Sequence, residues 1–247
     1  MRVRIRYTKF GKVRFTSHRD MARVWERAFR KADIDVVYTE GFSPRPKLHF
    51  GLALSTGHES EAEYLDADFI GDLDLAALPA RLNVAVPDGI ITTGVEEVPP
   101  GTPSLQEDVS ATRWSIVLDG VTLEGATEAV AAALAAPSIT LTRVRKGEER
   151  TDDVRPAIEA LTVEARTTPG GTDVVLDAVL ATRPRGLRPA ELLAALFPHH
   201  HDPEFLWQRV VRIQQFIERD GSRRELGPLC PLAQAPAPRA QEQLACA

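Results

Sequence analysis

Cysteine is scarce in this sequence, and its scarcity excludes several kinds of protein. Among 247 residues only Cys230 and Cys246 are cysteines, and both lie close to the C-terminus. A disulfide framework is therefore not expected, and a cytoplasmic location is the default. The two thiols are also too few for a cubane iron–sulfur cluster, which takes about three or four thiolates. We expect neither a metal nor another cofactor to be bound.

Long apolar runs are missing as well. No run approaches the roughly 18 residues that span a bilayer. Residues 1–7 alternate basic and apolar side chains, where a signal peptide would have an apolar segment. We therefore expect no association with a membrane. The hydrophobic fraction of 43% still suffices for a packed core, so wholesale disorder is excluded.

Acidic side chains are sparse at the start of the chain, and basic ones are sparse directly after it. Residues 1–50 contain 13 Lys and Arg against 5 Asp and Glu, whereas residues 51–110 contain one Arg, Arg81, against 12 Asp and Glu. This asymmetry predicts an oriented electric field. The basic segment is suited to binding phosphates, and the acidic segment is suited to a basic partner protein.

Hydrophobic periodicity predicts two α+β domains in tandem. A strand hairpin that turns at Gly11-Lys12 is followed by a helix, two strands, a helix and a strand, and a related pattern starts again after a Pro-rich linker. This order is typical of ferredoxin-like (RAMP/RRM-like) domains, with helices on one sheet face and the other face free for RNA. The predicted boundaries are 1–98 for the first domain, 99–112 for the linker, 113–226 for the second domain and 227–247 for a disordered C-terminal tail.

Residues 15–51 are the segment in which we predict a binding site. Apolar side chains recur there at helical spacing, and Ser17 is a suitable N-cap with Asp20 three positions further on. A stiff turn follows, and its characteristic residues are Gly41, Phe42, Pro44 and Pro46. After the turn, residues 45–50 alternate basic and apolar side chains as in a strand.

The candidate residues for RNA and phosphate binding come from the first strand, the helix and the strand after the turn. They are Arg2, Arg4, Arg6, Ser17, His18, Arg19, Arg23, Arg27, Arg30, Arg45, Lys47 and His49. Because a helix N-terminus attracts anions, we expect the start of the helix and the edge of the strand to converge on one phosphate. Few aromatic side chains accompany these cations, so we expect recognition of the RNA backbone more than of its sequence.

Three further features invite a chemical interpretation. His18 or His49 would suit general acid–base cleavage of RNA, because the pKa of histidine lies near neutrality; a simple phosphate or packing contact is the alternative. Residues 199–202 contain three adjacent histidines and an aspartate, but adjacent ligands do not easily converge on one ion, so we expect no metal. Arg150 and Arg155 either clamp a ligand or pair locally with neighbouring acidic residues.

Three motifs make the chain resemble a known family. They are S-H-x-D at residues 17–20, G-F-x-P-x-P at residues 41–46 and S-x-x-E-Y-x-D at residues 60–66. With them, residues 1–219 resemble the radical SAM-linked protein family, whose members are bacterial proteins encoded beside, or fused to, a radical SAM protein. The Ala- and Arg-rich composition resembles that of actinobacterial proteins. In actinobacteria, genes of this family tend to lie near genes for ribonuclease E and ribosomal proteins. The resemblance implies an RNA or ribosomal setting and carries over no catalytic residues.

The expected function is that of a non-catalytic accessory of a radical SAM enzyme. Because its cysteines are too few to make the chain the radical enzyme itself, it would present RNA, such as tRNA or rRNA, to that enzyme. No DNA is expected as a partner. One alternative is a metal-independent endoribonuclease that uses His18 or His49. Another is a pure protein–protein adaptor, in which the acidic residues 59–74 meet a basic partner.

Overall fold

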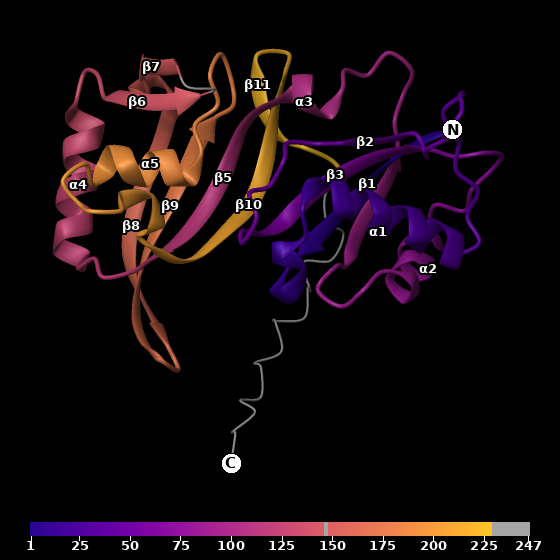
Figure 1. The fold of residues 1–247 in the computed structure, drawn as a ribbon, viewed down its shortest axis with the longest axis horizontal. Helices are drawn as coiled ribbons and strands as arrows, with labels where there is room; N and C mark the ends of the chain where they lie inside the picture. The colour runs from indigo at the N-terminus through magenta and orange to yellow at the C-terminus, as the bar shows by residue number, and fades with distance from the viewer. Residues whose placement is uncertain (146–147, 229–247) are drawn as a thin grey trace.

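The computed structural model describes residues 1–145 and 148–228, and the N-terminal half supplies four strands and two α-helices (Figure 1). Its strands are β1 (Arg2–Lys9), β2 (Leu48–Phe50), β3 (Glu59–Asp68) and β4 (Thr92–Glu97), and its helices are α1 (His18–Lys31) and α2 (Leu78–Ala85). The predicted turn and returning strand at residues 11–15 are wrong, because a 3-10 helix, η1 (Gly11–Phe15), lies there. The Gly11 N–H donates to the Glu59 carboxylate over 3.0 Å instead of to a strand partner.

The C-terminal half supplies five more strands to the same sheet, two α-helices and a separate hairpin. The strands are β5 (Val109–Leu118), β8 (Ile158–Thr168), β9 (Gly171–Ala181), β10 (Trp207–Arg219) and β11 (Ser222–Glu225). The helices are α4 (Leu123–Ala135) and α5 (Pro189–Leu196), and the hairpin pairs β6 (Thr140–Arg145) with β7 (Glu148–Asp153). Two short 3-10 helices, η2 (Arg155–Ala157) and η3 (Pro203–Phe205), complete this half.

One mixed sheet therefore runs through both halves of the molecule. Its strand order is β4-β1-β3-β10-β5-β9-β8, while β2 pairs with β3 and β11 pairs with β10. The halves meet where β10 runs parallel to the start of β3, with Val211 opposite Glu59 and Arg212 opposite Ser60. The predicted mixed α+β class is confirmed.

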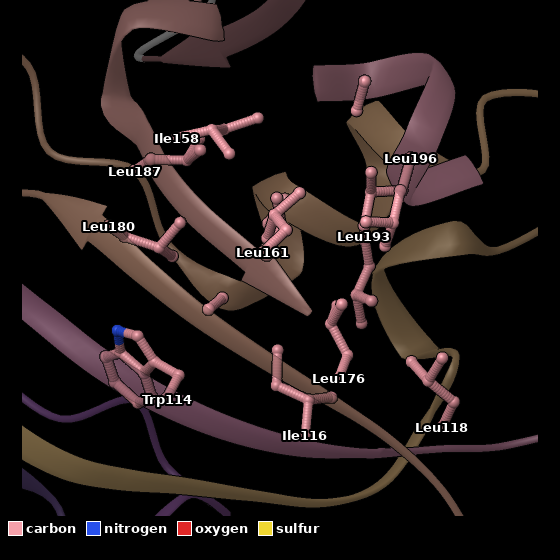
Figure 2. Close-up of a cluster of buried hydrophobic side chains, with 14 of the residues drawn as sticks. Trp114, Ile116, Leu118, Ile158, Leu161, Leu176, Leu180, Leu187, Leu193 and Leu196 are labelled. Carbon is pink, nitrogen blue, oxygen red and sulfur yellow. The ribbon is translucent and has the colours of Figure 1, made fainter. Parts of the chain in front are cut away.

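Each half has its own apolar core. In the C-terminal half, Ile116 of β5, Leu176 of β9 and Leu193 of α5 lie among the buried side chains of one cluster (Figure 2). In the N-terminal half, the ring of Trp25 on α1 is fully buried, and its centroid lies 4.9 Å from that of Tyr7 on β1. The helices of each half are held to the sheet by these contacts, which leaves the outer face of α1 exposed.

The other face of the N-terminal sheet is covered, contrary to the prediction that it is free for RNA. A third cluster of buried side chains lies there, made of Ala62, Tyr64, Leu105, Val109 and Leu226. Leu105 belongs to a short helix, α3 (Leu105–Asp108), inside the predicted linker, and Leu226 follows β11. Periodicity within a strand shows that a face exists but not which distant segment packs on it.

Two boundaries differ from the prediction or lie outside the described residues. The first strand of the second half starts at Val109, within the predicted linker 99–112. Of the predicted tail 227–247, only Gly227 and Pro228 are described, and Gly227 lies against the carboxylate of Glu96. Among the described helices, none is both long and apolar enough to cross a membrane.

Candidate functional site

A cleft of about 460 Å³ lies between the outer face of α1 and the edge strand β2. Its lining consists of His18, Arg19, Ala22, Arg23 and Glu26 from α1, with Arg45, Pro46, Leu48 and Phe50 from the turn and β2. Small-molecule sites usually occupy about 300–1,000 Å³, so the cleft has room for a ligand of nucleotide size. Three arginines and one glutamate give its lining an excess of positive charge.

Helix α1 presents its basic face because its apolar stripe is buried and its first turn is capped. Met21, Trp25 and Phe29 of the stripe are at most 3% exposed. The Ser17 hydroxyl accepts the Asp20 N–H over 3.2 Å and donates to the Asp20 carboxylate over 2.7 Å, which confirms the predicted cap. The hydrogen bond from Ser17 is the main cause that holds the pKa of Asp20 below its usual value. This carboxylate already occupies part of the helix N-terminus.

The turn before β2 positions the opposite wall of the cleft. The Thr39 N–H donates to the Arg45 carbonyl over 2.8 Å, and the Arg45 N–H donates to the Thr39 hydroxyl over 3.0 Å, so the turn is closed at its base. Gly41 has a φ of +122°, a conformation that side chains with a Cβ rarely adopt. Phe42 next to it is fully exposed. The turn therefore places a free aromatic ring three residues from Arg45.

His18 and His49 lie on opposite sides of β2, so they do not share a site. The His18 ring lies 5.1 Å from the ring of Phe50, whose neighbours in the strand ladder belong to the core under α1. Since side chains alternate along a strand, His49 points to the other face, where its Nε2 lies 3.9 Å from the Asp68 carboxylate. Lys47 precedes Leu48 and His49 follows it, so both point to the face opposite to that of Leu48. The expected convergence on one phosphate is therefore corrected: Arg45 joins His18, and Lys47 and His49 do not.

The remaining candidate arginines fall into three groups. Within the described residues, Arg19, Arg27 and Arg45 are exposed and make no side-chain hydrogen bond or ion pair. Partners on the same helix neutralise the next two, because Arg23 pairs with Asp20 and Arg30 pairs with Glu26, each over 3.0 Å.

The third group is on β1, away from the cleft. Arg2 bonds Asp68 over 2.7 Å and is partly exposed, whereas Arg4 bonds Asp66 over 2.8 Å and is only 4% exposed. Arg6 is 8% exposed. Arg4 and Arg6 are thus interior residues, which corrects their assignment to a basic surface. Charge alternates along β1 as the sequence predicts, but the polar face of this strand is covered.

Below the cleft lies a polar cluster that sequence reasoning missed. Lys9, His58, Glu63 and Arg212 are all buried where the two halves meet. Arg212 bonds the Glu63 carboxylate over 2.8 Å. Burial, together with the positive charges of Arg212 and Lys9, lowers the pKa of His58 to about 4. The only sequence signal was the placement of charged residues at positions where a strand alternation would bury them.

The motif at residues 60–66 proves to be a connector between the halves. The Ser60 hydroxyl donates to the Arg212 carbonyl over 3.3 Å, and the Tyr64 hydroxyl donates to the Leu226 carbonyl over 2.7 Å. Glu63 holds the Arg212 guanidinium in the same region. Ser60, Glu63 and Tyr64 in this segment therefore make contacts inside the protein, to Arg212 and to Leu226.

The last candidates are Arg150, Arg155 and the histidines at residues 199–202. The Arg155 guanidinium donates to the carbonyls of Leu134 and Ile158 over 3.1 and 2.9 Å and not to the neighbouring acidic side chains, while Arg150 is exposed on β7. In the described ranges, no group of three or more His, Cys, Asp or Glu side chains is placed to hold a metal ion.

Comparison with known proteins places the chain in a family but not in a functional class. No curated protein matches it. A chain from the structure titled "Crystal Structure of a Cbf5-Nop10-Gar1 Complex" is 11% identical, with a TM-score of 0.45; the match covers 86% of this chain and 48% of that one, so this chain spans about half its length. A likeness this weak supports no argument. A family model matches residues 2–189, most of the chain, and the chain therefore belongs to the family described as "Uncharacterized protein conserved in bacteria (DUF2344)".

Proposed function

We propose that this protein binds RNA, such as tRNA or rRNA, in the cleft between α1 and β2 and acts as a non-catalytic accessory of a radical SAM enzyme. The observation that carries the proposal is the pair Arg19 and Arg45, which line the cleft from both walls and make no side-chain hydrogen bond or ion pair in the described chain. Unpaired guanidinium groups are suited to phosphate because they bind it through two parallel hydrogen bonds. Exposed Phe42, three residues before Arg45 in the turn, supplies a surface on which a base can stack.

The strand order supports a ferredoxin-like ancestry for both halves. In the first half the spatial order is β4-β1-β3-β2, and in the second it is β10-β5-β9-β8. Along the chain, α1 follows β1 and α2 follows β3, and in the same way α4 follows β5 and α5 follows β9. We infer that each half is a ferredoxin-like unit. Such units are frequent RNA binders, although here the cleft and not the covered sheet face offers the cations.

The radical SAM partner is inferred from the sequence motifs alone. The motifs at residues 17–20, 41–46 and 60–66 resemble the radical SAM-linked family. Of these, the first two border the cleft and the third holds the halves together. Copurification of a radical SAM enzyme with the tagged protein from its host, retained after nuclease treatment, would support this part of the proposal, and its repeated absence would contradict it.

RNA binding is tested by fluorescence anisotropy with labelled tRNA over a series of salt concentrations. We expect affinity to fall steeply with salt. Arg19→Gln combined with Arg45→Gln should make the slope of log Kd against log salt shallower by about one for each phosphate that the variant no longer neutralises. The matched control exchanges Arg166 and Arg224, two exposed arginines of the other half, for Gln. Equal affinity of the cleft variant and the control variant would overturn the proposal.

The two alternatives receive less support from the geometry. An endoribonuclease that pairs His18 with His49 lacks the necessary proximity, so only His18 could act on a ligand in the cleft. The adaptor requires an acidic surface at residues 59–74, but Glu59, Glu63 and Asp66 are buried and bonded to arginines. Incubation of RNA with the pure protein and EDTA tests the enzyme directly, because cleavage that is abolished in His18→Ala would favour it.

A further inference from the structure

A small cavity of about 20 Å³ lies beneath the cleft. His18 and Phe50 line both spaces, so the cavity adjoins the inner end of the cleft. Its remaining lining consists of Tyr7, Lys9, Met21, Gly51, Leu52, Leu54, Glu63 and Tyr64. A space of this size holds about one water molecule or one carbonyl oxygen. Lys9 and Glu63 are the charged residues of this lining.

Lys9 is unusual among the basic residues of this protein. The sequence has 30 Lys and Arg, few of them lysines, and among the described lysines Lys9 is the one that is buried, at 3% exposure. Its Nζ donates to the Thr16 carbonyl over 2.9 Å and forms no ion pair with any described residue. An ammonium has three N–H donors to satisfy, whereas a neutral amine can use one N–H here and keep its lone pair free.

The surroundings of Lys9 lower its pKa. Burial is the largest cause that lowers the pKa of Lys9; the nearby Glu63 opposes it, and the charge of Arg212 adds to it. The carboxylate of Glu63 is bonded to Arg212, and this ion pair offsets part of the negative charge that acts on Lys9. Burial also keeps Tyr7 and Tyr64 uncharged by raising the pKa of each, and His58 is neutral above a pKa of about 4.

We propose that Lys9 is a reactive amine at the inner end of the cleft and forms an imine with a small anionic aldehyde or ketone. A lysine that is desolvated beside another cation is a recognised nucleophile for carbonyl groups. An arginine at this position would stay protonated and could not react. Arg19 and Arg45 would hold the anionic end of the compound while its carbonyl group reaches the cavity. The inference shares the cleft with the proposed RNA site but does not depend on RNA.

The reaction needs no reagent beyond the carbonyl compound. The Lys9 lone pair attacks the carbonyl carbon, and the carbonyl oxygen takes up a proton, which gives a carbinolamine. The nitrogen then loses a proton, the hydroxyl group gains one, and water leaves as the C=N bond forms. Glu63 and His18 line the same cavity as Lys9 and carry the groups that would transfer these protons.

The test uses glyoxylate as the probe, with cyanoborohydride to reduce any imine to a stable amine. The full-length protein is treated near neutral pH and low salt, and the modified lysines are mapped by peptide mass spectrometry. We expect Lys9 to react faster than the exposed Lys12, because the cleft concentrates the anionic probe next to the cavity that Lys9 lines. Saturating phosphate should slow the reaction at Lys9 and leave Lys12 unchanged.

Three variants separate a reactive Lys9 from a purely structural one. Arg19→Gln with Arg45→Gln should slow the labelling of Lys9 by glyoxylate but not by uncharged formaldehyde. His18→Ala should slow the labelling of Lys9, because it removes one of the groups proposed to transfer protons. Lys9→Arg should abolish the labelled peptide while RNA affinity is kept, so the two proposals can fail separately. If Lys9 reacts more slowly than Lys12 in the folded protein, or the double arginine variant has no effect on glyoxylate labelling, the inference is wrong.

Discussion

At the scale of single residues, four of the five acidic side chains of β3 are bonded to arginines from elsewhere in the chain. Glu59 shows this most fully. Its carboxylate accepts from Arg209 over 2.7 Å, from the Gly11 N–H over 3.0 Å and from Arg14 over 3.3 Å. Burial raises the pKa of Glu59, but the hydrogen bonds from Gly11 and Arg209 outweigh it and leave the pKa below its usual value. The charge of Glu59 therefore stabilises the folded state.

The first prediction concerns Glu59→Gln and pH. A carboxyl group whose pKa is lowered by folding stabilises the protein above its unfolded pKa of about 4.3, and this contribution disappears as the pH falls through the folded pKa. We expect the variant to be less stable than wild type near neutral pH and the difference to shrink below about pH 4. Urea unfolding at a series of pH values measures it, and Glu61→Gln, at an exposed site of the same strand, is the control. A difference that does not vary with pH would contradict the assignment.

At the scale of elements, Asp153 and Arg155 at the end of β7 connect the hairpin to the rest of the second half. Arg155 follows β7 and donates to the carbonyl of Leu134 in the last turn of α4. Helix ends leave carbonyl groups without partners, and a guanidinium is one way to satisfy them. The Asp153 carboxylate accepts the backbone N–H groups of Ile139 and Arg155, which lowers its pKa. These contacts fasten the hairpin to the helix.

The second prediction compares Arg155→Ala with Arg150→Ala. Removal of the hydrogen bonds from Arg155 should lower the free energy of unfolding by about 1.5–3 kcal/mol, the usual range for bonds to a charged group. Arg150 is exposed and should change it by less than about 0.5 kcal/mol. Urea unfolding of both variants provides the measurement. Equal losses of stability would show that Arg155 does not secure the end of α4.

At the scale of the whole molecule, a buried polar seam joins the two halves. Arg212 of β10 is 1% exposed and bonds Glu63 of β3, and its guanidinium lies 5.3 Å from the Trp114 ring. His58 packs against the ring of Trp207 in the same region, with centroids 5.2 Å apart. Because the sheet is continuous through this seam, we expect the halves to unfold together in one transition.

The third prediction concerns the buried pair Glu63 and Arg212. Arg212→Leu leaves an uncompensated carboxylate in the interior and should cost about 3–5 kcal/mol. Glu63→Leu combined with Arg212→Leu removes both charges and should cost clearly less than either single change, because a buried pair can be replaced by apolar side chains at little net loss of stability. Urea unfolding of the single and double variants tests this. Additive effects would show that the two side chains do not interact.

Local sequence patterns determined the elements of this protein and the cap of its main helix. The apolar stripe and Ser17 specified α1, and strand alternation located most of β1, β3 and β5, because these signals act between residues a few positions apart. The same patterns named Arg19 and Arg45, which line opposite walls of the cleft. Arg19 is exposed because it lies on the outer face of α1, and Arg45 is exposed because it lies in the turn before β2.

Only the tertiary structure decided which charges remain free and which residues meet. Arg4 and Asp66 pair across two strands that lie far apart in the chain, and the covering of their sheet face depends on Leu226 at the far end of the described chain. Strand register and the packing of distant segments set such contacts, and neither leaves a local signal. The packing of α1 on the Phe50 side of β2 likewise separates His18 from His49, and the packing of the two halves buries Lys9 beneath the cleft. The sequence contains many arginines, and the fold leaves only a few of them exposed and unpaired beside the cleft.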